Sequence, residues 1–233
     1  MPDLLAIGQQ LSIWFLPVVT AITVHEAAHA FAADRLGDDT ARRLGRLSFN
    51  PVRHVDPFGT LVLPGILLLL QAPFLFGWAK PVPVAFHRLH HPKRDMVWVA
   101  LAGPAVNVAM ALAAALLLHL VWQSPDRLGD WISANLQAAI GFNIILAVFN
   151  MMPIPPLDGG RVLTGILPLP LAIRYARIER YGLLILLGLL FIVPMLGREL
   201  GFDVNPVATI LGPFLDALQR IVLVATGWPL PPS

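Results

Sequence analysis

Two histidines and a glutamate stand at metal-site spacing near the start of the chain, in the sequence HEAAH at residues 25–29. Residues four apart lie on one face of an α-helix, so His25 and His29 can both reach a single ion. This spacing predicts a zinc site, with Glu26 positioned to act on a zinc-activated water as general acid/base. The alternative is a pair of histidines held by interhelical hydrogen bonds, with Glu26 facing a loop.

The residues around this motif are apolar enough to enter a bilayer. Between Leu11 and Ala33 no residue other than these three is ionisable. Ionisable side chains are costly inside a membrane helix, and where they occur they are functional by default. The setting therefore favours the metal site over the hydrogen-bonded pair of histidines.

A third metal ligand is expected, because a catalytic zinc usually has three protein ligands and one open position. Asp158 is the best candidate, since it follows a predicted span that ends on the same side of the membrane as the histidines. The prolines in 153–156 exclude regular helix before it, and Gly159-Gly160 allow unusual backbone angles after it. The alternative is that Asp158 only caps the helix that follows.

The composition is typical of integral membrane proteins. Of the 233 residues, 57% are hydrophobic and 13% are charged, and the mean hydropathy is +0.72. The net charge of +2 comes without a basic tract with interleaved aromatic residues, so we exclude nucleic-acid binding. Cysteine is absent, which excludes disulfides and thiolate metal ligands.

The apolar stretches predict the elements that carry these residues. We expect helices over 7–36, 96–122, 131–152 and 181–196, and an amphipathic helix lying on the membrane over 203–228. The fold class is then an all-α polytopic membrane protein, a bundle of about four to six transmembrane helices with a re-entrant segment and short interfacial β-strands. We expect one membrane-embedded domain over 1–233, with its catalytic core at about 7–165 and an accessory span and amphipathic segment over 181–233.

The arginines predict the orientation of the helices. Five lie between positions 35 and 53, and four more lie between 161 and 180, which marks both regions as cytoplasmic. If so, the segment 57–76 either enters and leaves the membrane on the same side, with Pro64-Gly65 as its turning point, or crosses it. We favour the re-entrant form, because bent backbone is tolerated at that depth where protein or water covers it.

Two short stretches, 46–56 and 78–86, alternate in polarity and are interrupted by prolines. This pattern suits an edge strand or a loop at 46–56 and an edge strand at the membrane interface at 78–86. An extended substrate could add to such an edge by β-augmentation.

These motifs together resemble the site-2 protease family of intramembrane zinc metalloproteases. HEAAH in a membrane helix is followed, at the family's spacings, by Asn150, Pro153, Asp158 and Gly159. The sequence GWAKPVPV at 77–84 and Gly103-Pro104 with Asn107 are similar to compact bacterial members that lack a PDZ domain. The resemblance runs from about Thr20 to Val162.

The resemblance implies a function and a role for each matching residue. His25, His29 and Asp158 would bind one zinc ion, and Glu26 would be the catalytic acid/base in hydrolysis of peptide bonds of transmembrane substrate proteins. Asn150 would hold the substrate or stabilise the transition state, unless it only caps its helix.

Asn107 is expected to form a structural hydrogen bond between helices. Histidines 54, 87, 90, 91 and 119 have no spacing that recommends them as ligands.

Two other classes of function stay open at this point. An ion transporter also carries buried His and Asp, but this sequence has no repeated halves. A metal-binding scaffold without proteolytic activity would not need Glu26.

The expected partners are the lipid bilayer and a transmembrane protein substrate. The expected location is the bacterial cytoplasmic membrane, as a multi-pass protein with its active site towards the cytoplasm; nothing in the sequence predicts the oligomeric state.

Overall fold

The computed structural model describes residues 4–62, 66, 80–124, 126–202 and 205–230, and within them the regular structure is helical, without a β-strand. Five helical segments are long and apolar enough to cross a membrane, and they cover residues 8–35, 92–121, 127–150, 179–199 and 206–226. The protein is therefore a multi-pass membrane protein. The all-α prediction is confirmed.

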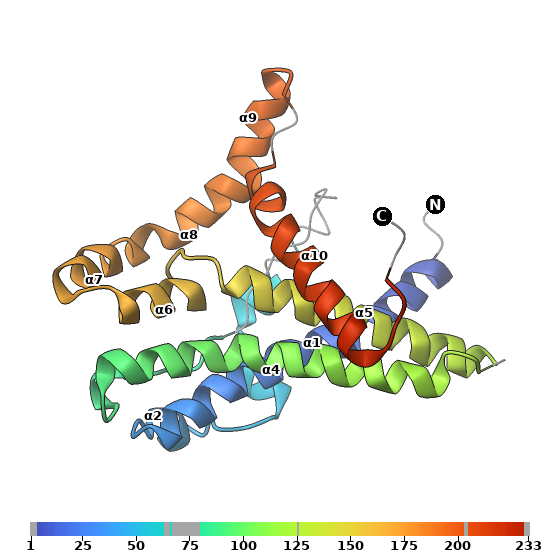
Figure 1. Ribbon diagram of the computed structural model, residues 1–233, viewed down its shortest axis with the longest axis horizontal. Helices are drawn as coiled ribbons and strands as arrows, with labels where there is room; N and C mark the ends of the chain where they lie inside the picture. The colour runs from blue at the N-terminus through green and yellow to red at the C-terminus, as the bar shows by residue number, and fades with distance from the viewer. Residues whose placement is uncertain (1–3, 63–65, 67–79, 125, 203–204, 231–233) are drawn as a thin grey trace.

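The core of the fold is formed by α1 (Leu4–Arg35), α4 (Pro92–Val121) and α5 (Arg127–Asn150), which all contact one another (Figure 1). Their contact faces are rich in small side chains. Ala33 on α1 packs in one cluster with Val99 of α4, and Ala111 and Ala115 on α4 pack against α5; all three alanines are 0% exposed. Small residues let membrane helices approach closely, which brings polar side chains on different helices within hydrogen-bonding distance.

Local signals fix where the core helices begin. Pro92 stands in the first turn of α4, and the Asp95 carboxylate accepts a hydrogen bond from the N–H of His91 at 2.7 Å. At the start of α5, the side chain of Asp126 accepts from the N–H of Gly129 at 2.6 Å. These caps satisfy N–H groups that have no partner inside the helix.

The second half of the chain is built from shorter helices. After α5 come α6 (Asp158–Ile166), which packs on α4, and then α7 (Leu169–Ala176). A rod of α8 (Glu179–Leu187), the π-helical turn η4 (Gly188–Ile192) and α9 (Val193–Glu199) then rises away from the core (Figure 1).

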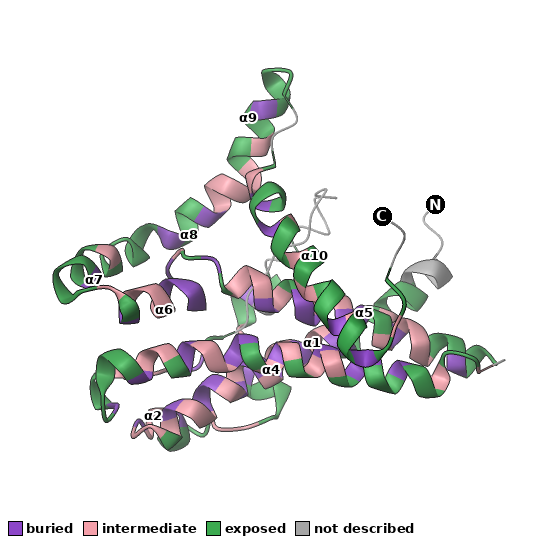
Figure 2. Cartoon of the chain, in the orientation of Figure 1, coloured by how far each residue is buried: buried purple, intermediate pink, exposed green. Residues whose placement is uncertain are grey.

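The last helix, α10 (Pro206–Thr226), returns diagonally across α4 and α5. Its Val222 is fully buried against the α4–α5 pair, whereas most of its surface is exposed (Figure 2). Exposed apolar side chains also predominate on α8 and α9, as expected of surfaces that face lipid tails.

Of the edge strand or loop predicted for 46–56, the structure shows a loop with short helical turns. After the short helix α2 (Thr40–Arg43), this stretch forms turns and the 3-10 helix η1 (Pro51–His54). The Asn50 side chain caps η1 by accepting a hydrogen bond from the N–H of Val52 at 3.0 Å, and Pro51 supplies the φ angle of a first helical turn. The local cap of η1 therefore outweighs the weak alternation of polar and apolar residues that would favour a strand.

The strand predicted for 78–86 also does not form in the described residues, 80–86. These are extended up to the 3-10 turn η3 (Phe86–Arg88), but no ladder pairs them. Pro81 and Pro83 lack N–H groups, so alternate donors are missing.

Of the predicted re-entrant segment, only the π-helical turn η2 (Pro57–Val62) and residue 66 are described, and its turning point at Pro64-Gly65 lies outside the described residues.

Candidate metal centre

Three side chains that the sequence singled out meet in one buried cluster. His25 and His29 extend from α1 with their Nε2 atoms 3.0 Å apart, and Asp158 is the first residue of α6. The Asp158 Oδ2 atom lies 3.3 Å from Nε2 of His25 and 3.2 Å from Nε2 of His29. All three residues are buried, so the cluster is shielded from bulk water.

The tautomer of His29 follows from its second ring nitrogen. Nδ1 lies 2.7 Å from the backbone carbonyl oxygen of Val99 on α4. A carbonyl only accepts hydrogen bonds, so Nδ1 carries the proton and donates it. In the neutral imidazole, Nε2 then presents a lone pair to the centre of the cluster.

The tautomer of His25 is fixed by a chain of two asparagines. Asn143 Nδ2 donates to the carbonyl of Ala139 at 2.8 Å, so its Oδ1 is left to accept from Asn107 Nδ2 at 2.7 Å. The remaining Asn107 atom, Oδ1, lies 2.5 Å from Nδ1 of His25. His25 therefore donates through Nδ1, and its Nε2 also presents a lone pair to the centre.

Two nitrogen lone pairs and a carboxylate oxygen thus point at one another. Asp158 Oδ2 is buried and has no hydrogen-bond partner in the described part of the chain. Such an arrangement is repulsive by itself and becomes favourable around a cation. Two imidazole nitrogens and one carboxylate oxygen form a donor set that suits zinc, as the sequence predicted.

Close backbone approach makes this geometry possible. A Cβ atom on Gly103 of α4 would lie 2.4 Å from His29 Nε2 and 2.5 Å from His25 Cε1. A Cβ on Gly159 would lie 2.2 Å from the carbonyl oxygen of Met151. Glycine at these positions lets α4 cover the imidazoles and lets the loop before α6 fold onto the helix that carries Asp158.

Glu26 lies beside the cluster and is half-buried. Its Oε2 accepts a hydrogen bond from the N–H of Val82 at 2.8 Å, and among the described residues Oε1 has no partner. One carboxylate oxygen is therefore held by the backbone, while the other can accept a proton.

Asn150 is not brought into contact with the cluster. It stands at the end of α5, where its side chain donates to the carbonyl of Leu146 on the same helix at 2.9 Å. Asn107 forms the interhelical hydrogen bond that was predicted, and its partners include a candidate ligand.

Asn143 is the residue that sequence reasoning missed. Its signal was present, because an asparagine in the middle of an apolar helix needs a polar partner inside the bundle.

Comparisons with known proteins find a peptidase family and relatives named as zinc metalloproteases. The family model "Peptidase family M50" matches residues 126–193, which include Asp158. "Putative zinc metalloprotease YwhC" of Bacillus subtilis is 36% identical over 184 residues, or 77% of this chain and 80% of that protein.

More distant relatives carry similar names. "Putative zinc metalloprotease Rip2" of Mycolicibacterium smegmatis is 32% identical over 180 residues, or 76% of this chain and 66% of that protein. "Putative zinc metalloprotease MJ0611" of Methanocaldococcus jannaschii is 46% identical over 103 residues, or 42% of this chain and 50% of that protein. No solved structure matches the chain at a significant level. With its similarity to YwhC over most of both sequences, the chain belongs to peptidase family M50, the site-2 protease family.

Proposed function

We propose that this protein is an intramembrane zinc metalloprotease that hydrolyses peptide bonds of transmembrane substrate proteins. The observation that carries the proposal is the buried convergence of two Nε2 lone pairs, from His25 and His29, with the unpartnered Oδ2 of Asp158. The neighbouring Glu26 supplies a carboxylate that a metal-binding scaffold or a transporter would not need.

In this proposal His25, His29 and Asp158 hold the zinc ion, all from the core between residues 7 and 165. Bound zinc would lower the pKa of a water molecule and polarise the scissile carbonyl. Glu26 would accept the proton of the attacking water through Oε1 and deliver it to the leaving amine as the peptide C–N bond breaks. The Val82 amide keeps Oε2 of Glu26 in place during both transfers.

An apolar cavity supports a transmembrane segment as substrate. It has a volume of about 940 Å³ and lies between α4, the end of α5, and α10. Its lining includes Ala102 and Pro104, which flank the Gly103 that touches both histidines, and Met151, which follows Asn150. We propose that Asn150 contacts the substrate from this position.

The charge distribution supports a location in the cell membrane with the active site towards the cytoplasm. The basic stretch 35–53 follows the end of α1, and the N–H of His90 donates to the carbonyl of Leu36 at 2.9 Å. The connection from α1 to α4 thus begins and ends on one side of the bundle. We propose that the segment 57–76 within it is re-entrant.

The proposal is tested by measuring zinc content and cleavage of a model transmembrane substrate for the wild-type protein and for Glu26→Gln. The glutamine variant should keep its zinc, because Glu26 is not a ligand, and lose about 10²–10⁴-fold in cleavage rate. His25→Ala serves as the comparison that should lose both zinc and cleavage. If the wild-type protein contains no zinc, or if Glu26→Gln cleaves as fast as the wild type, the proposal fails.

A further inference from the structure

The residues from Lys80 to Ala85, here called the crossing segment, run past Glu26 and touch it through the backbone. The N–H of Val82 donates to Glu26 Oε2 at 2.8 Å, and the Val82 side chain is buried. Pro81 and Pro83 fix their φ angles, so this part of the chain is stiff. A shift at either end of the crossing segment is therefore transmitted to the Val82 amide.

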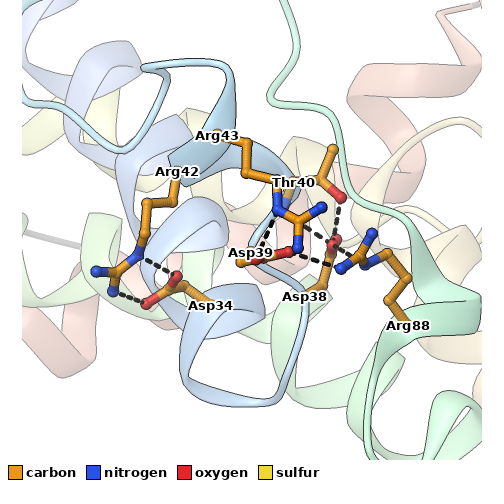
Figure 3. Close-up of polar contacts among 7 residues, drawn as sticks. All are labelled: Asp34, Asp38, Asp39, Thr40, Arg42, Arg43 and Arg88. Atoms are coloured by element: carbon orange, nitrogen blue, oxygen red, sulfur yellow. Dashed lines mark hydrogen bonds and ion pairs between the residues drawn. The ribbon is translucent and has the colours of Figure 1, made fainter.

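The Ala85 end is held by a buried carboxylate. Asp38, in the turn after α1, is 0% exposed, and its Oδ2 accepts a hydrogen bond from the N–H of Ala85 at 2.6 Å. Its Oδ1 accepts from the N–H of Thr40 at 3.0 Å and from the Thr40 hydroxyl, and Arg88 Nε lies 3.7 Å away (Figure 3). Burying a carboxylate is costly unless it is fully hydrogen-bonded, and here both oxygens are used.

The Lys80 end is held by a buried guanidinium. Arg46 is 8% exposed, and its Nη2 donates to the carbonyl of Lys80 at 2.8 Å. The N–H of Lys80 in turn donates to the carbonyl of His54 at 2.9 Å. Burial lowers the pKa of Arg46, while the negative charge of nearby Glu26 opposes that shift. Two buried charges of opposite sign therefore hold the two ends of the crossing segment.

Two other ion pairs near the end of α1 are exposed to solvent and do not hold the crossing segment. Arg42 binds Asp34, and Arg43 binds Asp39 at 2.7 Å, through arginine side chains that are more than 60% exposed (Figure 3). Neither aspartate accepts a hydrogen bond from the backbone of the crossing segment. Exposed pairs of this kind contribute little to stability, so they provide matched controls for the two buried charges.

We propose that Asp38 and Arg46 are positioning residues, which hold the crossing segment so that the Val82 amide stays on the carboxylate of Glu26. The inference rests on the proposed role of Glu26 as general acid/base. Neither residue would touch substrate or metal. Releasing one end lets the Val82 amide move and frees Glu26 to rotate, and a displacement of about 1 Å can lower a catalytic rate by about 10²-fold.

The test compares Asp38→Ala and Arg46→Met with the control Arg43→Met, which removes an exposed arginine paired, among the described residues, only with Asp39, and with Arg46→Lys, which keeps a charged donor for the Lys80 carbonyl. Hydrogen exchange of the amides in residues 80–86 is measured by mass spectrometry on the zinc-loaded proteins, together with zinc content, kcat and KM. Amide hydrogen exchange reports whether the crossing segment is held in place, and it does not require cleavage of a substrate.

Asp38→Ala and Arg46→Met should speed amide exchange in 80–86 and lower kcat by about 10²-fold, with zinc content and KM close to wild type. Arg46→Lys should restore most of both readouts, and Arg43→Met should change neither. If Asp38→Ala does not fold, the comparison of Arg46→Met with Arg46→Lys still tests whether a buried charge holds the Lys80 end of the crossing segment.

Unchanged exchange in Arg46→Met, or equally fast exchange in Arg43→Met, would overturn the inference. A wild-type protein that cleaves no substrate would instead refute the proposed function, and the exchange data would still report whether the two charges hold the segment.

Discussion

At the scale of single residues, the metal centre depends on hydrogen bonds that leave the ligand atoms free. The carbonyl oxygen of Val99 and the side-chain oxygen of Asn107 each accept a hydrogen bond from one ring nitrogen, so the other nitrogen of His29 and of His25 can bind a metal. This arrangement needs α4 to lie directly against the imidazoles. The absence of a side chain at Gly103 allows that contact.

Gly103→Ala should therefore lose zinc. The added methyl group would fall 2.4 Å from Nε2 of His29, the atom that would bind the ion, and the rigid backbone of α4 cannot yield easily. We expect zinc affinity to fall by at least about 10–100-fold, as for disruption of groups that orient metal ligands. Competition with a chromogenic chelator measures this directly. Gly141→Ala is the control, since a Cβ there meets no atom within 4 Å, and equal zinc affinity in both variants would contradict the geometry.

The three residues that meet in the candidate centre could be predicted from the sequence, but the hydrogen bonds that orient them could not. The spacing of His25 and His29 and the glycine-proline context of Asp158 are local signals that resemble a known family. The role of Asn143 depends on the rotation of α5 against α4, which no local pattern encodes. The same holds for Asp38, whose position after Gly37 looks like an ordinary helix-ending turn until Ala85 is brought to it by the fold.

At the scale of elements, the long helices follow from apolar length, and their predicted limits agree with α1, α4 and α5 within about five residues. The predicted strands did not form because proline removes donors from a ladder, and alternation alone does not supply a partner strand.

The contact between the loop before Asp158 and the start of α8 could not be predicted from the sequence. A Cβ on Gly182 would lie 1.7 Å from the carbonyl oxygen of Pro155.

Gly182→Ala should consequently destabilise the protein. The new methyl group must displace the backbone of the loop that leads into α6, and overpacking of this kind costs about 1–3 kcal/mol. Thermal unfolding in detergent would detect a lower Tm. Gly188→Ala on the same rod is the matched control, because its Cβ would meet nothing within 4 Å and alanine favours helix over glycine. An unchanged Tm in Gly182→Ala would argue against the loop contact.

At the scale of the whole molecule, the two ends of the bundle differ in charge. Arginines gather beyond the end of α1, whereas the turn between α4 and α5 holds Gln123 and Ser124. The positive-inside rule then assigns the end of α1 to the cytoplasm and that turn to the outside.

The chain has no cysteine, so single cysteines can report this orientation without background. Gln123→Cys should react with a membrane-impermeant maleimide in intact cells, and Arg43→Cys should react only after the membrane is opened. Both positions are exposed in the fold. The reverse labelling pattern would place the active site towards the outside.

The wide separation of His29 and Asp158 along the chain has a consequence for biogenesis. The ribosome must complete α1, α4, α5 and the first turn of α6 before the third donor of the centre exists. In the proposed site, zinc would join the first and last of these helices as a cross-link does, and its binding free energy would contribute to folding if only the folded state binds it. Under this proposal, loading of the ion would mark the point at which the membrane-inserted chain becomes a finished enzyme, and a chain cut short before Asp158 would remain an inserted but metal-free bundle.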